Sequence, residues 1–238
     1  MDVKKEAARV ASTLVAGNTS VGLGDGSTVR LLAEYLTERM NAGLEIRLYT
    51  SSQQTLEFLQ RRGVLVNDIS STDALDIYFD GCDQIDGQLN ALKSGSGIHT
   101  MEKLLASMAK KFVIIGDTSK FVQKLDPKFP LVLEVIPQAM AFVQRNLSSI
   151  YPECTLTVRK SPDPEFKPVL TRNGNLLLDC WFREWPDLEM IQLQSKKITG
   201  VVEISLFYQM VHEAIIAGSD GIARYAKRND QIHLLQTI

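Results

Sequence analysis

The sequence predicts an α/β protein with a mostly parallel sheet and a smaller α+β unit inserted in the second half of the chain. In the first half, short apolar strands alternate with helical segments of about ten to fifteen residues, the pattern of βαβ units. Beyond Pro127 this alternation ends, and seven of the eight prolines follow. The 238 residues, 45% of them hydrophobic, can bury a core in one domain or in two unequal ones.

Helices in the first half are indicated by apolar residues three or four positions apart. In the first helix these residues are Val3, Ala7, Val10 and Leu14. Asp2 is placed to cap this helix, and Asn41 and Gly43 close the second one. The expected helices are residues 2–16, 27–43, 51–60 and 101–111, and the expected strands are residues 19–24, 44–49, 75–79 and 112–116.

The second half shows a different order of elements. The expected strands are residues 131–136, 155–159, 169–171 and 176–180, and the expected helices are residues 138–149 and 188–195. After Gly200 we expect a strand and then a helix, which return to the first sheet. The predicted domains are therefore a larger one of residues 1–127 and 199–238 and a smaller α+β one of residues 128–198.

Charge and composition exclude several classes of function. The 26 Lys and Arg residues against 28 Asp and Glu residues give no global basic field for nucleic acid or an anionic membrane. The apolar stretches fall far short of the roughly 18 residues that span a bilayer, and no signal peptide is recognisable. Cys82, Cys154 and Cys180 lie far apart, which argues against disulfides and zinc. We expect a cytoplasmic protein with no metal, no membrane partner and no nucleic-acid partner.

Four polar clusters follow predicted strands, where open α/β sheets bind their ligands. The first is the turn 21–28, in which glycines allow a close approach of the backbone, and Ser27 and Thr28 offer donors to an anion at a helix N-terminus. A dinucleotide-binding fingerprint is excluded because its third glycine is missing. Taken alone, the cluster fits a plain tight turn capped by Ser27 equally well.

The other three clusters carry charged side chains. Asp80 and Asp83 stand on either side of a glycine and could converge on one polar ligand or serve as turn residues. Lys93 opens a Gly/Ser loop that ends with Glu102 in the first turns of a helix, where a glutamate commonly complements the helix dipole. Lys120 ends the fourth cluster, and a solvated turn lysine is the alternative there.

Several segments lie in the order, and nearly at the spacings, of one known family. They are GLGDGST, DGCDQID, KSGSGIHTMEK, IIGDTSK, EVIP, NGNLLLD and GVVEISLF. Together they span nearly the whole chain and resemble ribose-5-phosphate isomerase, type A, as a divergent member. The resemblance implies a Rossmann-like domain with a smaller, ferredoxin-like lid. It also implies a metal-independent isomerase of the non-oxidative pentose phosphate pathway that interconverts D-ribose 5-phosphate and D-ribulose 5-phosphate through an enediolate. A homodimer or homotetramer without a cofactor, with a sugar phosphate as its ligand, is implied as well.

The same resemblance implies roles for individual residues. Glu102 matches the base that moves a proton between C1 and C2, a task that suits a carboxylate whose pKa is raised by burial. Asp80 and Asp83 match positions that bind sugar oxygens and assist ring opening or proton transfer. Lys93 would stabilise the enediolate oxygen. The implied substrate-binding residues are Lys4, Asp25, Gly26, Ser27, Thr28, Gly81, Cys82, Ser94, Gly95, Ser96 and Lys120.

The chain departs from the family pattern near the expected site. Asp25 stands where the family usually has Thr beside the phosphate, and a carboxylate about 4–5 Å from a phosphate costs on the order of 1–3 kcal/mol unless it points away. Gln84 replaces an acid, and Cys82 replaces an alanine. Two alternatives stay open: an isomerase for a different sugar or sugar phosphate, and a non-catalytic module that senses sugar phosphates.

Overall fold

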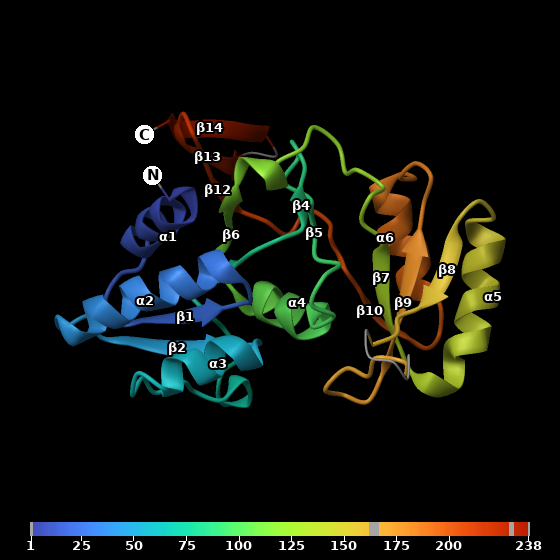
Figure 1. The fold of residues 1–238 in the computed structure, drawn as a ribbon, viewed down its shortest axis with the longest axis horizontal. Helices are drawn as coiled ribbons and strands as arrows, with labels where there is room; N and C mark the ends of the chain where they lie inside the picture. Colours follow the sequence, from blue (N-terminus) through green and yellow to red (C-terminus); the bar gives the residue numbers. More distant parts are fainter. Residues whose placement is uncertain (1, 162–166, 229–230, 238) are drawn as a thin grey trace.

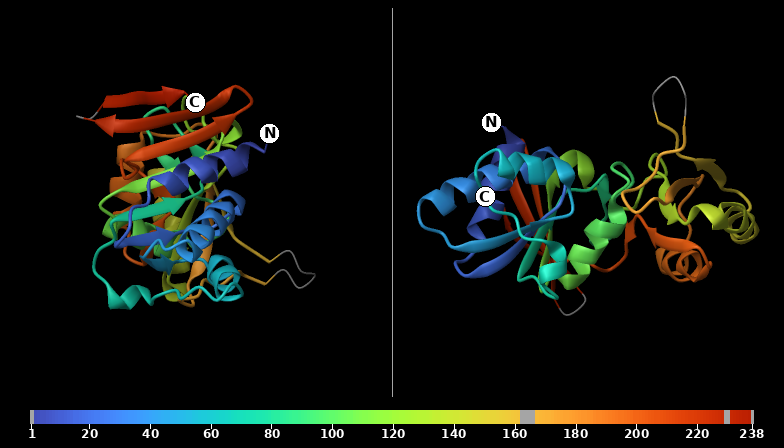
Figure 2. Two further views of the ribbon diagram at one scale, coloured as in Figure 1. Left: turned by 90° about the vertical axis from the view of Figure 1, so that its left-hand side faces the viewer. Right: turned by 90° about the horizontal axis from the view of Figure 1, so that it is seen from below.

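The computed structural model describes residues 2–161, 167–228 and 231–237 (Figure 1). Its helices and strands form two units, one around a seven-stranded sheet and one around a four-stranded sheet. Figure 2 shows the smaller unit beyond one end of the larger one, with α4 between the larger sheet and the smaller unit. None of the helices in the described ranges is long and apolar enough to cross a membrane.

The larger sheet is mostly parallel, with the order β14-β13-β12-β6-β3-β1-β2. The antiparallel pairings are at one end of the sheet, β12 with β13 and β13 with β14. Its strands are β1 (Thr19–Leu23), β2 (Ile46–Thr50), β3 (Ile77–Asp80), β6 (Phe112–Asp117), β12 (Glu213–Gly218), β13 (Gly221–Arg228) and β14 (Gln231–Thr237). The helices of this unit are α1 (Val3–Thr13), α2 (Ser27–Asn41), α3 (Gln53–Gln60) and α4 (His99–Met108), with 3₁₀ turns at Ile69–Ser71 and Thr118–Lys120.

Side chains alternate between the two faces of this sheet and build two apolar clusters. Val21 and Ile77 belong to the cluster under α1 and α2. Tyr78 and Phe112 belong to the cluster on the opposite face, together with residues of α4. Burial on both faces explains why β3 and β6 are nearly continuous apolar runs. The carboxyl ends of β1, β3 and β6 meet at one edge, and three of the predicted clusters begin there.

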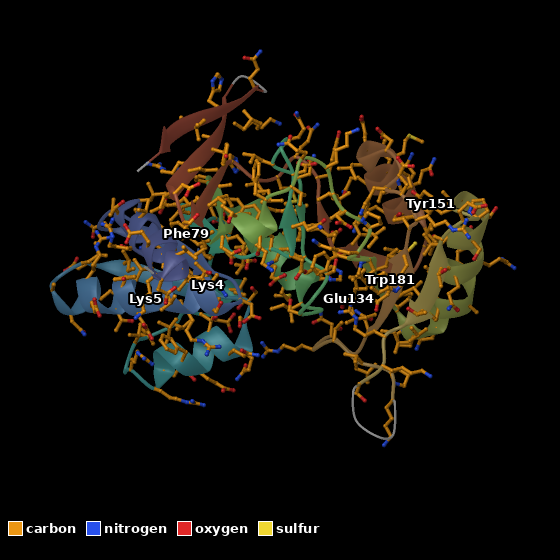
Figure 3. All side chains as sticks on the ribbon, turned by 45° about the horizontal axis from the view of Figure 1, so that its top comes forward. Lys4, Lys5, Phe79, Glu134, Tyr151 and Trp181 are labelled. Atoms are coloured by element: carbon orange, nitrogen blue, oxygen red, sulfur yellow. The ribbon has the colours of Figure 1, made fainter. Side chains whose placement is uncertain are left out.

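The smaller unit is an antiparallel sheet with the order β10-β7-β9-β8. Its elements run β7 (Leu131–Val135), α5 (Met140–Ile150), β8 (Thr155–Val158), β9 (Leu176–Trp181), α6 (Leu188–Lys197) and β10 (Val201–Ile204), with a 3₁₀ turn at Pro137–Ala139. This β-α-β-β-α-β order is the ferredoxin-like arrangement. The predicted fold class is therefore confirmed. Tyr151 and Trp181 mark this unit and Phe79 the larger one in Figure 3.

Three details of the second half were predicted wrongly. The strand after Gly200, expected in the larger domain, is β10 and pairs with β7 of the small sheet. No helix follows it within residues 205–228, because the apolar run there forms the buried strand β12, and a short apolar run does not distinguish a strand from a helix. The expected strand 169–171 makes only isolated bridges, at Pro168 and Leu170. The division into two domains at 127 and 198 stays a prediction.

A third, three-stranded sheet and a buried lysine join the two units. Its strands are β4 (Gln84–Ile85), β5 (Ala91–Leu92) and β11 (Leu206–Phe207), in the order β11-β5-β4. On α4, Lys103 Nζ donates hydrogen bonds to the carbonyl oxygens of Ile204 and Leu206, at 2.6 and 2.7 Å. This anchors α4, which carries Glu102, to the segment that connects the small unit with the large sheet.

Candidate active site

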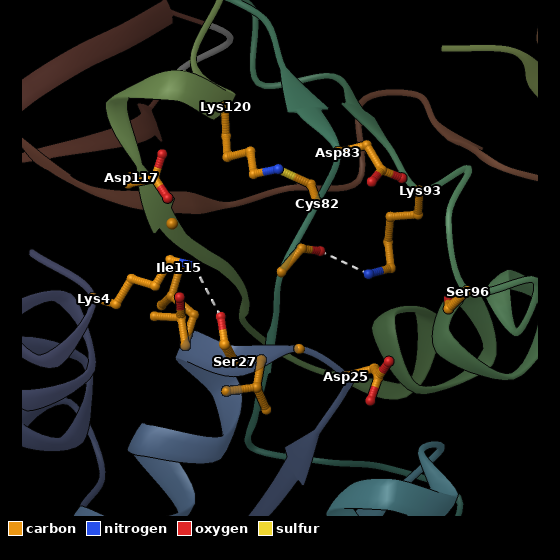
Figure 4. Close-up of a pocket in the computed structure, with 15 residues that line it drawn as sticks. Lys4, Asp25, Ser27, Cys82, Asp83, Lys93, Ser96, Ile115, Asp117 and Lys120 are labelled. Carbon is orange, nitrogen blue, oxygen red and sulfur yellow. Dashed lines mark hydrogen bonds between the residues drawn. The ribbon is translucent and has the colours of Figure 1, made fainter.

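A cavity of about 240 Å³ opens at the carboxyl ends of β1, β3 and β6 (Figure 4). It is lined by most of the residues that the sequence singled out, which come from five separate segments. They are Lys4, Asp25, Gly26, Ser27, Thr28, Gly81, Cys82, Asp83, Lys93, Ser96 and Lys120. The fold therefore brings together, in one place, residues that lie more than a hundred positions apart in the sequence.

Lys93 connects the cavity to two buried carboxylates. Its Nζ lies 3.0 Å from Asp80 Oδ1 and 3.3 Å from Glu102 Oε1, and it donates a hydrogen bond of 2.7 Å to the carbonyl oxygen of Gly81. The side chains of Asp80 and Glu102 are fully buried and do not line the cavity themselves. Three of the four predicted catalytic residues, Asp80, Lys93 and Glu102, thus form one compact cluster, and Lys93 is the member of this cluster that lines the cavity.

Glu102 has the surroundings of a base. Burial raises the pKa of its carboxyl to about 8, and the negative charge of Asp80 acts in the same direction, while Lys93 opposes both. Neither carboxylate oxygen has a hydrogen-bond partner among the described residues, and the charge of Lys93, at 3.3 Å from Oε1, is the partner of this carboxylate. A carboxylate with a pKa near neutrality can take up a proton and release it again at physiological pH.

Asp80 and Lys93 stabilise one another in their charged forms. Burial leaves the pKa of Asp80 raised, although the charge of Lys93 and the hydrogen bonds of the carboxylate oppose this effect. The donors are the hydroxyl of Tyr78 at 2.5 Å and the backbone N–H groups of Gly81 and Asp25 at 2.8 and 3.1 Å. Burial disfavours the charge on Lys93, yet the two carboxylates outweigh burial and leave the pKa of the ammonium raised. Lys93 is therefore a fixed cation at the edge of the cavity.

The opposite end of the cavity is built to receive an anion. Helix α2 begins there with Gly26 as its cap, in a backbone conformation of φ +112° that favours glycine and without a side-chain cap. The first N–H groups of a helix have no partner within the helix and carry the positive end of its dipole. Lys4 Nζ donates a hydrogen bond to Ser27 Oγ at 3.1 Å, and Lys120 lines the same cavity.

Asp83 is held by the loop that follows Lys93. Its Oδ2 accepts hydrogen bonds from the backbone N–H groups of Ser94 and Gly95, at 2.6 and 2.8 Å. The Ser94 hydroxyl donates to the carbonyl oxygen of Pro130 at 2.5 Å. Ser94 and Gly95 do not line the cavity, whereas Asp83 and Ser96 do. The structure therefore gives Ser94 and Gly95 a part in orienting Asp83.

Asp25 is turned away from the anion-binding end. Its Oδ1 accepts a hydrogen bond of 2.6 Å from the hydroxyl of Ser52, the cap of α3. Figure 4 shows its side chain directed away from Lys4 and Ser27. The electrostatic cost expected for a carboxylate beside a phosphate is accordingly reduced. The charge of Asp25 acts instead on Glu102, whose pKa it helps to raise.

Four lining residues were given no site role by the sequence analysis: Val29, and Ile115, Gly116 and Asp117 of the fourth cluster, in which only Lys120 was assigned one. The last three end β6, whose carboxyl end lies at the same edge as those of β1 and β3, and this position could have identified them. Cys82 was singled out and lines the cavity. Burial raises the pKa of its thiol to about 12, so it is a neutral filler of the wall and not a nucleophile.

Comparison with known proteins identifies relatives that match most of the chain. The family described as ribose 5-phosphate isomerase A (phosphoriboisomerase A) matches residues 47–221. Ribose-5-phosphate isomerase A 1 of Oceanobacillus iheyensis is 37% identical over 221 residues, 92% of this chain and 96% of that one. Ribose-5-phosphate isomerase A of Archaeoglobus fulgidus is 37% identical over 225 residues, 93% of this chain and 97% of that one.

Solved structures of ribose 5-phosphate isomerases also superpose on this chain over most of its length. Ribose 5-phosphate isomerase from Plasmodium falciparum superposes with a TM-score of 0.88 at 30% identity, covering 96% of this chain and 100% of that one. A D-ribose-5-phosphate isomerase in complex with phospho-erythronic acid superposes with a TM-score of 0.87 at 28% identity, covering 94% of this chain and 98% of that one.

Proposed function

The chain belongs to the ribose 5-phosphate isomerase A family, and we propose that it interconverts D-ribose 5-phosphate and D-ribulose 5-phosphate through an enediolate, with Glu102 as the base. The observation that carries the assignment of the base is the buried Glu102 carboxylate, 3.3 Å from Lys93 Nζ. Lys93 lines one end of the cavity, and the positively charged start of α2 forms the other end. An open-chain pentose phosphate fits this arrangement, because it has a carbonyl at one end and a phosphate dianion at the other.

The proton transfer involves one base in both directions. In the open-chain aldose, the Glu102 carboxylate takes the proton from C2, the electrons of that C–H bond form the C1–C2 double bond, and the carbonyl oxygen on C1 becomes the enediolate oxygen. Glu102 then delivers its proton to C1, the hydroxyl on C2 loses its proton to become the ketone, and the oxygen on C1 gains a proton. A base with a pKa of about 8 can both remove the proton from C2 and deliver it to C1, because neither protonation state of the carboxyl is strongly favoured near neutral pH.

Lys93 and the two aspartates support this transfer. The Lys93 ammonium stabilises the negative charge that develops on the enediolate oxygen, and such preorganised electrostatic stabilisation is usually the largest single contribution to the rate. Asp80 keeps Lys93 in place through the 3.0 Å ion pair. Asp83, which lines the cavity, is in a position to bind sugar hydroxyls and to carry the proton between the two oxygens.

The phosphate is assigned to the start of α2. The N–H groups of the first helical turn, the hydroxyls of Ser27 and Thr28, and the ammonium groups of Lys4 and Lys120 supply donors and positive charge. The related isomerase in complex with phospho-erythronic acid supports this arrangement, because that ligand carries a phosphate and a carboxylate at the two ends of a short hydroxylated chain.

Incubation with ribose 5-phosphate, followed by detection of ribulose 5-phosphate, tests the proposal. We expect turnover by the wild-type protein. A protein that binds ribose 5-phosphate in a calorimetric titration but forms no ribulose 5-phosphate would be a sensing module and would contradict the proposal. Turnover of a different aldose phosphate in the absence of ribose 5-phosphate turnover would instead identify a different substrate.

Lys4 is expected to contribute to the binding of the phosphate. Replacing Lys4 by Gln removes one charged donor, so KM for ribose 5-phosphate is expected to rise about tenfold while kcat changes little. The matched control is Lys5→Gln, because Lys5 is the next residue of α1, is exposed and does not line the cavity (Figure 3). Equal KM values for the two variants would contradict the assignment of the phosphate end.

Asp25 is expected to tune the base more than the phosphate. Because its charge helps to raise the pKa of Glu102, Asp25→Asn is expected to lower that pKa and to move the acidic limb of kcat/KM to lower pH. The asparagine can still accept the hydrogen bond of Ser52. The control is Asp220→Asn in the exposed turn between β12 and β13. An unchanged limb together with a sharply lower KM would show that Asp25 acts on the phosphate instead.

Assembly and location complete the proposal. We assign the protein to the cytoplasm as a homodimer or homotetramer, as the resemblance to the family implies. Light scattering on the purified full chain measures its mass, and a particle of 26.5 kDa, the mass of one chain, would contradict the assembly.

A further inference from the structure

The buried carboxylate of Asp80, which holds Lys93, has a tyrosine partner that the mechanism above does not use. Tyr78 is fully buried, and its hydroxyl donates a hydrogen bond of 2.5 Å to Asp80 Oδ2. The other oxygen, Oδ1, is the one that faces Lys93 at 3.0 Å. Tyr78 therefore occupies one oxygen of the carboxylate while the lysine occupies the other.

Two glycines of the neighbouring strand make room for this pair. Gly22 is the register partner of Tyr78 between β1 and β3, and Gly24 follows two residues later, beside Asp80. A Cβ added to Gly22 would lie 2.7 Å from Tyr78 Cδ2, and one added to Gly24 would lie 2.1 Å from Asp80 Cγ. Both distances are too short for any side chain. Gly22 and Gly24 are therefore required because Tyr78 and Asp80 leave no room for a Cβ atom. Gly26 has room for one, and a glycine is favoured there by its positive φ angle.

The ring and the hydroxyl of Tyr78 are both held firmly. The ring stacks on Phe112 with a centroid separation of 5.2 Å. Burial raises the pKa of the phenol well above its ordinary value, and the charges of Asp80 and Glu102 act in the same direction. The phenol consequently stays protonated and remains a hydrogen-bond donor throughout the pH range in which the carboxylates titrate.

We infer that Tyr78 is a positioning residue of the isomerase site: it holds Oδ2 of the Asp80 carboxylate while Oδ1 faces Lys93. Gly22 and Gly24 are glycines because this pair fills the space beside them. The inference rests on the proposed function. Without the hydroxyl, Asp80 Oδ2 would be buried with no partner among the described residues, and the carboxylate would take up a proton more readily, although Gly81 and Asp25 still donate to Oδ1. A protonated Asp80 loosens Lys93, which is needed at the enediolate oxygen, and leaves the phosphate end untouched.

The test is Tyr78→Phe, which keeps the ring and removes only the hydroxyl. We expect kcat to fall by about ten- to a hundredfold, with KM within about twofold of the wild-type value. The acidic limb of kcat/KM is expected to move to higher pH, because loss of the hydrogen bond disfavours the state in which both carboxylates are ionised. The other titratable groups facing the pair are unchanged in the variant; they are Lys93, Asp25 and Cys82.

Tyr151→Phe is the matched control. Tyr151 is a largely buried tyrosine at the end of α5 in the small unit, and its hydroxyl has no hydrogen-bond partner among the described residues (Figure 3). Its variant should keep the wild-type kcat and pH profile. A second variant, Gly22→Ala, presses on the Tyr78 ring from β1 and is expected to move the acidic limb in the same direction as Tyr78→Phe.

The outcomes separate the inference from the function. An active wild-type protein whose Tyr78→Phe variant has an unshifted acidic limb overturns the inference alone, whatever happens to its melting temperature. A wild-type protein that does not isomerise ribose 5-phosphate overturns the proposed function, and the inference with it. A lowered kcat with a shifted limb, absent from Tyr151→Phe, supports both.

Discussion

Glu102→Gln is expected to lower kcat for ribose 5-phosphate by about 10³- to 10⁴-fold, because the amide cannot take the proton from C2. The substitution keeps the size of the side chain and leaves the phosphate end intact, so KM should change only a few-fold. Steady-state measurement of ribulose 5-phosphate formation gives both constants.

Helix α6 offers a matched control for this substitution. Glu189 lies in the first turn of α6, as Glu102 lies in the first turn of α4, but Glu189 is exposed. Glu189→Gln should retain wild-type activity, which separates the role of a base from that of a residue that complements a helix dipole. A Glu102→Gln variant with more than about a tenth of the wild-type kcat would contradict the assignment of the base.

The same variant has an expected signature in stability. Burial raises the pKa of Glu102 to about 8 from its ordinary 4.5, so in this window the folded protein holds a proton that the unfolded chain has lost. The wild-type protein therefore loses stability as the pH rises through the window, and the glutamine variant does not. We expect the Tm of Glu102→Gln, relative to that of the wild type, to increase between about pH 5 and pH 8.

Lys93→Met is the second substitution with a large expected effect. It removes the cation proposed to stabilise the enediolate, so kcat is expected to fall by about 10²- to 10³-fold. It also leaves Asp80 and Glu102 buried together without a counter-ion. Breaking a buried ion pair typically costs about 3–5 kcal/mol, and we expect a loss of this size in the free energy of unfolding at a pH where the carboxylates are ionised.

Lys128→Met provides the comparison for Lys93→Met, because Lys128 is exposed and its ion pair with Asp126, at 3.7 Å, lies on the surface. Surface pairs contribute about 0–1 kcal/mol, so this variant should unfold and turn over like the wild type. A Lys93→Met variant with wild-type kcat would contradict the electrostatic role of the lysine, and one with wild-type stability would contradict the geometry of the cluster.

The first half of the fold was predictable because its strands are buried on both faces and its helices on one. Helix α2, for example, begins at Ser27 as expected and ends within two residues of the expected position. The return of the chain after Gly200 was not predictable in the same way. The strand β10 is short and half buried, and nothing in its residues indicates which of two sheets it joins. Such a choice depends on long-range pairing that local pattern does not record.

The site was predictable where its residues follow strands and less so where they act through one another. Lys93, Asp83 and the turn 25–28 lie on the cavity wall, as a ligand-contacting role requires. The sequence could not indicate that Glu102 lies against Lys93, or that Tyr78 holds Asp80, because these are contacts between elements brought together only by the fold. The glycines at 22 and 24 suggested a ligand, although they accommodate side chains of the next strand.

The decisive measurement is kcat/KM for ribose 5-phosphate between about pH 6 and pH 9. With Glu102 as the base, kcat/KM rises with pH to a midpoint near 8, because only the ionised carboxylate can take the proton from C2. Lys93 keeps its proton over this range, since the two carboxylates raise its pKa, and it adds no basic limb. A kcat/KM that does not vary over this range, or the absence of ribulose 5-phosphate at every pH, would contradict the assignment of Glu102 as the base of an isomerase.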